Sequence, residues 1–172
     1  MKFCYYIIIL LNVVVVFVNS VHVKVLAPSQ NGTFDIGIII TPGADIAGEA
    51  YEPLGLKIQK SFPGRMWIAL LCDFPFNTPN PVQLPRAVDD AISTFKKKGF
   101  QGNDIFLAGH SLGGVFVGMY GKKHPSKLAG VMLFASYLTK PNRLRDYPVP
   151  LLTLSGDLDG LTRITRVVDT FE

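Results

Sequence analysis

Cysteine is scarce in this sequence, which holds only two among 172 residues. Cys4 lies in an apolar N-terminal run and Cys72 stands alone in a strand-like segment, so we expect no intrachain disulfide once that run is removed. We interpret Cys72 as a small buried residue. The sequence also lacks a large excess of positive or negative charge, because 17% of the residues are charged and the formal net charge is only +4. These absences exclude a disulfide-rich scaffold and argue against nucleic acid as a partner.

Long hydrophobic runs are absent except at the N-terminus, where Lys2 precedes an apolar stretch over residues 3–18. This pattern predicts a secretory signal peptide over residues 1–20, cleaved after Ser20, and hence a secreted protein. An uncleaved anchor is the alternative, but the run is interrupted by Asn12 and is shorter than the ~20 apolar residues that span a bilayer. We therefore expect one domain over residues 21–172 without stable membrane insertion, and a glycosylation site at Asn31 in the sequon Asn-Gly-Thr.

The remaining chain alternates short β-branched runs with longer amphipathic ones, which predicts an α/β fold with a mostly parallel sheet. A turn near Asn31 favours a hairpin between strands at 21–26 and 34–40. Further strands are expected at 67–72, 105–108, 131–134 and 151–155, and helices at 49–60, 84–98, 112–122 and from about 161.

The most informative segment is the apolar run at 105–108 followed by Gly109-His110-Ser111-Leu112-Gly113 and a helical pattern. This Gly-x-Ser-x-Gly arrangement between strand and helix predicts a nucleophile elbow, in which a strained turn projects the Ser111 hydroxyl above the sheet. The flanking glycines let the two backbones approach closely. A glycine-rich turn with a capping serine is the alternative interpretation.

A nucleophilic serine also needs oxyanion donors and an acid that orients a base. The backbone N–H of Leu112, directly after the nucleophile, is one expected donor, and that of Ala44, in the loop after the strand at 34–40, is the second. Asp159 follows the strand at 151–155 by a few residues and is the preferred acid, with Asp157 as the fallback. Either aspartate could instead be an ordinary turn or capping residue.

The loop from Asp73 to Leu84 is rich in proline and asparagine and follows a strand whose carboxyl end faces the expected crevice. Phe74 and Phe76 are therefore candidate walls of a substrate pocket, although they could equally cover the sheet edge. Tyr137 and Leu138 are the other candidate walls. Because residues 137–150 amount to a connecting loop and not a lid, we expect an open, shallow site for small esters.

Several ordered motifs between residues 34 and 168 resemble those of compact, lidless esterases in the α/β-hydrolase superfamily. The matching segments are Pro42-Gly43-Ala44, 49–54, 74–77, the elbow at 109–113, 128–131, 135–137 and Gly156-Asp157-Leu158-Asp159-Gly160. The resemblance implies an α/β-hydrolase fold and a serine esterase in which Ser111 is the nucleophile, Asp159 the triad acid, and Ala44 and Leu112 the oxyanion donors. It implies a small-molecule ester as substrate and neither a metal nor an organic cofactor. The oligomeric state is left open.

One departure from this family is serious, because no histidine follows Asp159 in the sequence. His22 lies far upstream, His110 adjoins the nucleophile with its side chain directed away, and His124 reads as a helix terminus. We expect a truncated sequence that lacks the last strand and the histidine loop. The alternatives are an inactive binding protein on the same scaffold and a nonfunctional fragment. As printed, the chain is expected to show almost no turnover, because loss of a triad histidine costs about a millionfold in rate.

Overall fold

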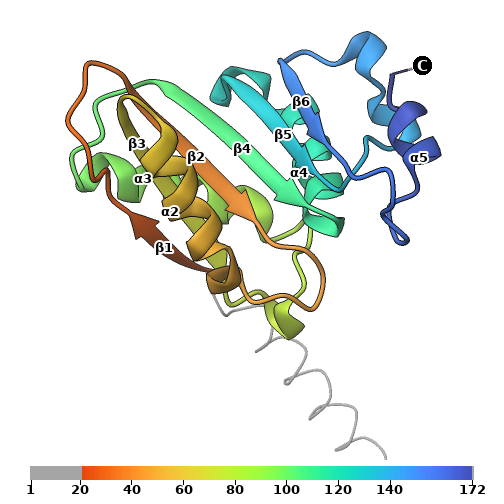
Figure 1. Cartoon of the computed structure of the whole chain (residues 1–172), viewed down its shortest axis with the longest axis horizontal. Coiled ribbons are helices and arrows are strands. Elements are labelled where there is room, and N and C mark those ends of the chain that lie inside the picture. Colours follow the sequence, from red (N-terminus) through yellow and green to blue (C-terminus); the bar gives the residue numbers. More distant parts are fainter. Residues whose placement is uncertain (1–20, 172) are drawn as a thin grey trace, which may run out of the picture.

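A computed structural model describes residues 21–171. Six strands form one sheet in the order β1-β3-β2-β4-β5-β6 (Figure 1). β1 is antiparallel to β3, and every other neighbouring pair is parallel. The predicted mostly parallel α/β sheet is therefore confirmed, whereas the predicted signal peptide lies outside the described residues. The strands are β1 (His22–Leu26), β2 (Asp35–Thr41), β3 (Arg65–Cys72), β4 (Asp104–His110), β5 (Gly130–Phe134) and β6 (Leu151–Leu154).

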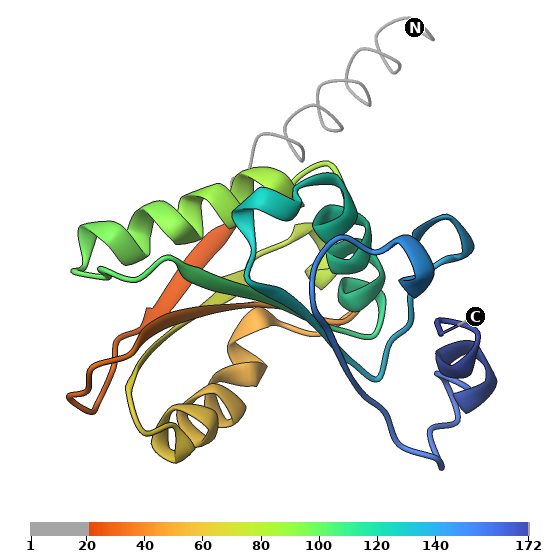
Figure 2. The ribbon, with the colours of Figure 1, turned by 90° about the horizontal axis from the view of Figure 1, so that it is seen from above.

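Helices cover both faces of the sheet. The α-helices are α2 (Glu52–Ser61), α3 (Leu84–Lys97), α4 (Leu112–Lys123) and α5 (Ile164–Val168). Short 3-10 helices are η1 (Gly48–Tyr51), η2 (Pro75–Asn77), η3 (Pro125–Lys127), η4 (Lys140–Asn142) and η5 (Leu144–Asp146). Figure 2 shows α3 and α4 on one face and α2 on the other. The first face buries Ile39 and Leu107 with Phe95 and Val117, and the opposite face buries Ile38 and Ile68.

The predicted hairpin between the first two strands is wrong. β1 pairs with β3 instead, in a register that sets His22 opposite Cys72, while β2 lies between β3 and β4. The physical reason is burial. Residues 38–40 of β2 are apolar and buried on both faces, which suits the interior of a parallel sheet, whereas β1 carries His22 and Lys24 and suits an edge.

Three predictions concern features away from the elbow. Asn31 is exposed in the loop between β1 and β2, so it is accessible to glycosylation, which itself stays a prediction. Cys72 is free and buried as predicted, and burial followed by the Glu49 carboxylate raises the pKa of its thiol to about 12. Within residues 21–171, none of the helices has the length and apolar character needed to cross a bilayer.

Candidate active site

Ser111 occupies the turn between β4 and α4, the position predicted for the nucleophile. Its backbone has φ 49° and ψ −122°, a conformation that is strained for a residue with a side chain. The turn is held in place by its backbone, because the Ser111 N–H donates to the Phe134 carbonyl at 3.0 Å and the Ser111 carbonyl accepts from the Gly114 N–H at 3.0 Å. The chain therefore has the local geometry of a nucleophile elbow.

The glycines around Ser111 allow the backbone segments to approach. An added Cβ on Gly109 would lie 2.6 Å from the Gly114 Cα, and one on Gly113 would lie 2.1 Å from the Pro42 carbonyl oxygen. At Gly114 it would lie 2.5 Å from the Cβ of Ser136. Since such separations are shorter than real Cβ contacts, these three positions need glycine for β4, α4 and the neighbouring loops to pack together.

Ser136 is a supporting residue whose role the sequence did not predict. Its side chain is fully buried, and its hydroxyl donates to the Ser111 carbonyl at 2.7 Å. It follows Ala135, which has φ 46° and lies just after β5. The turn after β5 therefore helps to fix the elbow.

The predicted oxyanion donors lie on segments that meet beside the elbow. Leu112 is the first residue of α4, and the first N–H groups of a helix have no acceptor within it. Ala44 is half-buried in the loop after β2, and the preceding Pro42 carbonyl lies against Gly113 of α4. These placements agree with the predicted donors, while the oxyanion function of Ala44 and Leu112 stays a prediction.

Tyr51 and His110 brace this loop. The Gly43 N–H donates to the Tyr51 hydroxyl at 3.1 Å, and the same hydroxyl is 2.7 Å from His110 Nδ1. Burial raises the pKa of Tyr51, so the phenol keeps its proton, which is then available to Nδ1. Burial also lowers the pKa of His110, opposed by the Asp159 charge. His110 is therefore a neutral packing residue here, and its contact with Tyr51, which lies 59 residues earlier in the chain, left no local signal in the sequence.

Asp159 lies in the loop between β6 and α5, where its Oδ1 accepts hydrogen bonds from the N–H groups of Leu161 at 2.8 Å and Thr162 at 2.9 Å. These two hydrogen bonds are the main reason that the pKa of Asp159 is lowered, and the nearby His110 lowers it further. The Thr162 hydroxyl donates to the Ala135 carbonyl at 2.9 Å, which ties this loop to the turn beside the elbow. Asp157, the fallback acid, is exposed and accepts no hydrogen bond within the described chain. The structure thus shows Asp159 in the turn-capping role that the sequence offered as its alternative, and the choice of Asp159 as the triad acid stays a prediction.

The predicted substrate pocket needs correction. Phe74 is 3% exposed and Leu138 is 4% exposed, and both belong to the hydrophobic core, so neither forms an open pocket wall. Burial of a large apolar side chain outweighs the preference for a surface loop. Phe76 is instead 83% exposed on η2. The Tyr137 ring is covered by the Arg166 guanidinium, whose Nη1 donates to the Tyr137 hydroxyl at 2.7 Å.

A base for Ser111 is missing from the described residues. His110 is bonded to Tyr51, His124 is the C-terminal cap of α4 with its ring stacked on Tyr120, and His22 begins β1. In residues 21–171, no hydrogen bond joins a histidine to the Ser111 hydroxyl. The placement of all three histidines agrees with the prediction that none is the triad base.

Comparisons with known proteins agree with this geometry. Residues 37–171 match the family described as Alpha/beta hydrolase family. The structure is similar to that of Est1E from Butyrivibrio proteoclasticus with ferulic acid bound, with a TM-score of 0.64, 15% identity, and coverage of 87% of this chain and 80% of that chain. It is also similar to a serine hydrolase homologue from Coxiella burnetii, with a TM-score of 0.63, 17% identity, and coverage of 86% and 74%.

A third similar structure is that of esterase PE8, with a TM-score of 0.60, 17% identity, and coverage of 86% of this chain and 80% of that chain. No curated protein matches the sequence. At these identities the structural likeness establishes the fold, and the chemistry must be argued from the site.

Proposed function

The chain belongs to the alpha/beta hydrolase family, and from this premise we propose that it is built to hydrolyse carboxylic esters with Ser111 as the nucleophile. The observation that carries the proposal is the strained backbone of Ser111, φ 49° and ψ −122°, between β4 and α4. A strained conformation persists only where its surroundings enforce it, and here Phe134, Ser136 and Gly114 all hold the Ser111 backbone.

In the proposed reaction the Ser111 oxygen attacks the ester carbonyl carbon while an imidazole base takes the serine proton, and that proton then passes to the alcohol as its C–O bond breaks. The carbonyl oxygen becomes an oxyanion, which the Leu112 and Ala44 N–H groups stabilise. Water then hydrolyses the acyl-enzyme and releases the acid. The bracing of Gly43 by Tyr51 supports this scheme, because it limits movement of the loop that carries Ala44.

The proposed triad needs Ser111, Asp159 and a histidine. Residues 1–172 contain no histidine after Asp159. Asp159 would orient the imidazole through the carboxylate oxygen that does not cap the loop, since its Oδ1 is occupied by Leu161 and Thr162. Without the imidazole, Ser111 keeps its proton and attacks slowly. The oxyanion donors are unaffected by this loss.

We also propose that the protein is secreted, on the strength of the charged and apolar pattern in residues 1–20. Its substrates would be small esters, because the segment between β5 and β6 is a connecting loop with two short 3-10 helices and does not form a lid. N-terminal sequencing of the product exported by expressing cells should begin at Val21. A product that retains residues 1–20 would contradict cleavage after Ser20.

Chemical rescue by imidazole tests the proposed chemistry. We expect hydrolysis of p-nitrophenyl acetate by the chain to be very slow in buffer and to rise about tenfold when imidazole is added, below the 10²- to 10⁴-fold that a positioned base supplies. The matched control is Ser111→Ala, whose rate with imidazole is subtracted because imidazole attacks this ester by itself. Equal rates for the folded wild type and Ser111→Ala at every imidazole concentration would contradict the role of Ser111.

The second candidate function is noncatalytic binding of a ligand on the same scaffold. The observation that favours it is the lack of any histidine hydrogen-bonded to Ser111 in the described chain, since His110 is turned to Tyr51. The rescue experiment separates the two candidates. A well-folded chain with no Ser111-dependent rate supports the binding protein, whereas Ser111-dependent rescue supports the hydrolase.

A further inference from the structure

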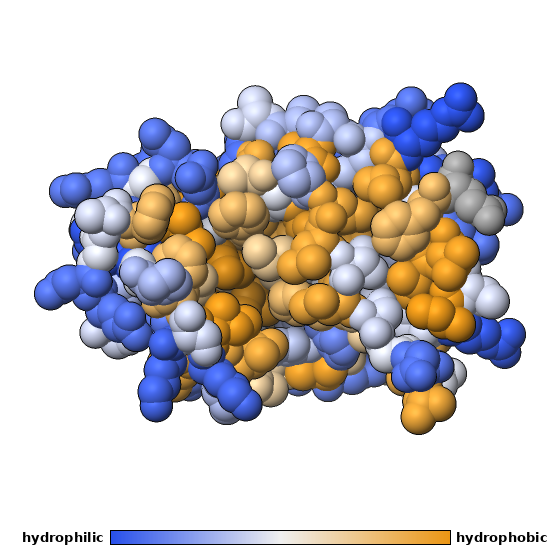
Figure 3. All heavy atoms as spheres, turned by 45° about the horizontal axis from the view of Figure 1, so that its top comes forward, coloured by the Kyte–Doolittle hydropathy of each residue, from blue (hydrophilic) through white to orange (hydrophobic). Residues whose placement is uncertain are grey.

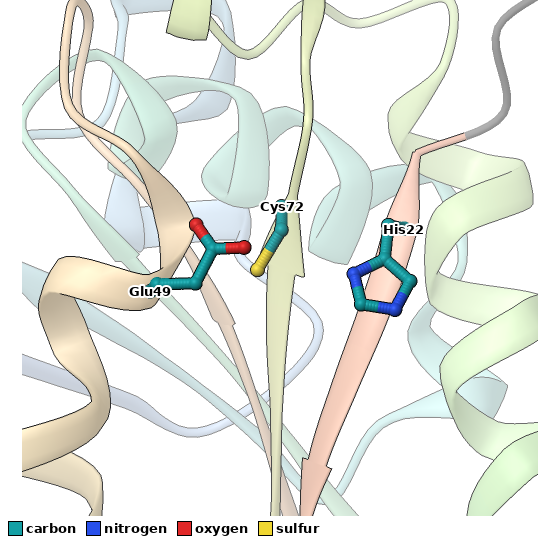
Figure 4. A group of neighbouring side chains, drawn as sticks. All are labelled: His22, Glu49 and Cys72. Carbon is teal, nitrogen blue, oxygen red and sulfur yellow. The ribbon is translucent and has the colours of Figure 1, made fainter.

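Three metal-ligating side chains meet at one edge of the sheet, away from Ser111. The ligand atoms of His22, Glu49 and Cys72 all lie within 4.8 Å of one another. Figure 4 shows them coming from three elements: His22 from β1, Cys72 from the end of β3 and Glu49 from η1, with one ring nitrogen of His22 and one carboxylate oxygen of Glu49 facing the sulfur. None of the three belongs to the proposed triad or its oxyanion donors.

The backbone places these side chains together in two ways. His22 and Cys72 are direct cross-strand partners in the antiparallel pair of β1 and β3, so their side chains share one face of the sheet. Glu49 is brought to the same face because Gly48 lies against β3. An added Cβ on Gly48 would lie 2.3 Å from the Leu71 carbonyl oxygen and 2.8 Å from the Cys72 sulfur. The approach of η1 to Cys72 therefore depends on glycine at position 48.

The three donors differ in their access to solvent. Cys72 is fully buried at the base of the cluster, whereas His22 and Glu49 are exposed above it. An ion can therefore approach from solvent past two exposed side chains and reach a thiol whose position the sheet fixes. The Lys24 ammonium, on the same edge strand, is paired with Glu52 at 2.8 Å, which offsets its charge.

Thiolate, imidazole and carboxylate form a ligand set suited to a borderline divalent ion. Zinc binds sulfur at ~2.3 Å and nitrogen or oxygen at ~2.0–2.2 Å, so tetrahedral ligand atoms lie about 3.3–3.6 Å apart. The observed limit of 4.8 Å requires each side chain to move by about an ångström or less. Magnesium and calcium prefer oxygen ligands alone and would be disfavoured by the sulfur and nitrogen donors.

We propose that His22, Glu49 and Cys72 form a binding site for Zn²⁺ or a similar transition-metal ion. The bound ion replaces the thiol proton, which passes to solvent. A fourth position is filled by water or by Asp73, which has a carboxylate oxygen 4.0 Å from His22 Nδ1. The ion would link the edge strand β1 and η1 to the end of β3. Because η1 also carries Tyr51, the site would stiffen the segment that braces Gly43.

Cobalt titration of the full chain tests this proposal without relying on enzymatic activity. We expect one equivalent of Co²⁺ to produce the near-ultraviolet absorption band of cobalt–thiolate coordination, and Zn²⁺, but not Mg²⁺, to abolish the band by displacement. Cys72→Ser should remove the band. His22→Gln and Glu49→Gln should weaken Co²⁺ binding at least about tenfold, which is 1.4 kcal/mol.

Matched controls decide the outcome. His124→Gln replaces an unrelated histidine and Asp157→Asn replaces an exposed acid outside the cluster, so both should bind Co²⁺ like the wild type. His22 and Glu49 are exposed, so their variants remain informative even where Cys72→Ser does not fold. The proposal is overturned by a folded wild type without a thiolate band, by unchanged Co²⁺ affinity in the His22 and Glu49 variants, or by loss of the band in His124→Gln.

Discussion

The two ends of the sheet are held in different ways. β3 packs against both α2 and α3, which lie on opposite faces of the sheet, and its residues 66–72 are all buried. β6, at the opposite edge, alternates between half-buried and exposed residues, with Leu152 46% and Leu154 54% exposed. Figure 3 shows apolar side chains across the middle and the right of the view. The exposed large apolar side chains of the C-terminal part include Leu158, Leu161, Ile164, Val168 and Phe171.

The same contrast distinguishes how the nucleophile and the acid are held in position. Ser111 is held by packed glycines and by a hydrogen bond from the buried Ser136. Asp159 is held by two backbone N–H groups of its own loop and lies on the less covered side of the molecule. The elbow is therefore preorganised by the core, whereas the acid owes its position to local hydrogen bonds.

The largest difference should appear when equal truncations are made in the two regions. Leu70→Ala removes a fully buried side chain of β3 and should lower the free energy of unfolding by about 3 kcal/mol through lost burial and a cavity. Leu154→Ala makes the same change on half-exposed β6 and should cost less than about 1 kcal/mol. Urea denaturation of both variants measures the contrast. Equal losses would mean that the two regions are packed alike.

A second comparison uses one added methyl group. Gly114→Ala would bring a Cβ to 2.5 Å from Ser136 and 2.8 Å from the Gly109 carbonyl oxygen, so overpacking should cost about 2 kcal/mol. Gly156→Ala meets nothing within 4 Å and should change stability by less than about 0.5 kcal/mol. Thermal denaturation distinguishes the two variants. A Gly114→Ala variant as stable as the wild type would show that the elbow accommodates an added methyl group.

The brace on the oxyanion loop should have a smaller effect. Tyr51→Phe removes the acceptor of the Gly43 N–H and the partner of His110, at a cost of about 1 kcal/mol. If the proposed reaction operates, the variant should lower the Ser111-dependent, imidazole-rescued rate while leaving substrate binding nearly unchanged. A rate equal to that of the wild type would show that the brace does not position Ala44.

The same brace predicts a pH dependence. Burial lowers the pKa of His110 below its usual 6.5. Between the lowered pKa and pH 6.5 the native state therefore binds fewer protons than the unfolded state. The contribution of His110 to stability is therefore complete above pH 6.5 and decreases as the pH falls toward the lowered pKa. His110→Gln should remove this decrease in chemical denaturation, whereas His124→Gln should retain it. The reverse pattern would contradict the assignment to His110.

The smallest effect is expected in the acid loop. The lowered pKa of Asp159 means that its capping bonds persist above its usual pKa of 3.8 and are lost as the pH falls through the lowered value. Amide chemical shifts of Leu161 and Thr162 should follow that titration and should change in Asp159→Ala at neutral pH. Asp157→Ala should leave both shifts unchanged, because Asp157 is exposed and caps neither group. Equal responses to the two substitutions would show that Asp159 does not order the loop.

The sequence predicted those features that depend on local pattern. The elbow was readable because a strand, two spaced glycines and a helix surround Ser111 in direct succession. The pairing partner of β1 could not be predicted in this way, because the short turn after β1 favours a hairpin with β2. Only the burial of β2 on both faces assigns it to the interior of the sheet. The core positions of Phe74 and Leu138 likewise depend on long-range packing. Contacts made by Tyr51 and Ser136 join distant segments and left no local signal.

The most direct test of the central claim is covalent capture of Ser111. The full chain is treated with a fluorophosphonate in the presence of imidazole, and the site of modification is read by peptide mass spectrometry. We expect a single phosphonyl adduct on the peptide that contains Ser111, and none in Ser111→Ala. A folded wild-type chain without the adduct, or an equal adduct in Ser111→Ala, would contradict the claim that the elbow carries a nucleophile.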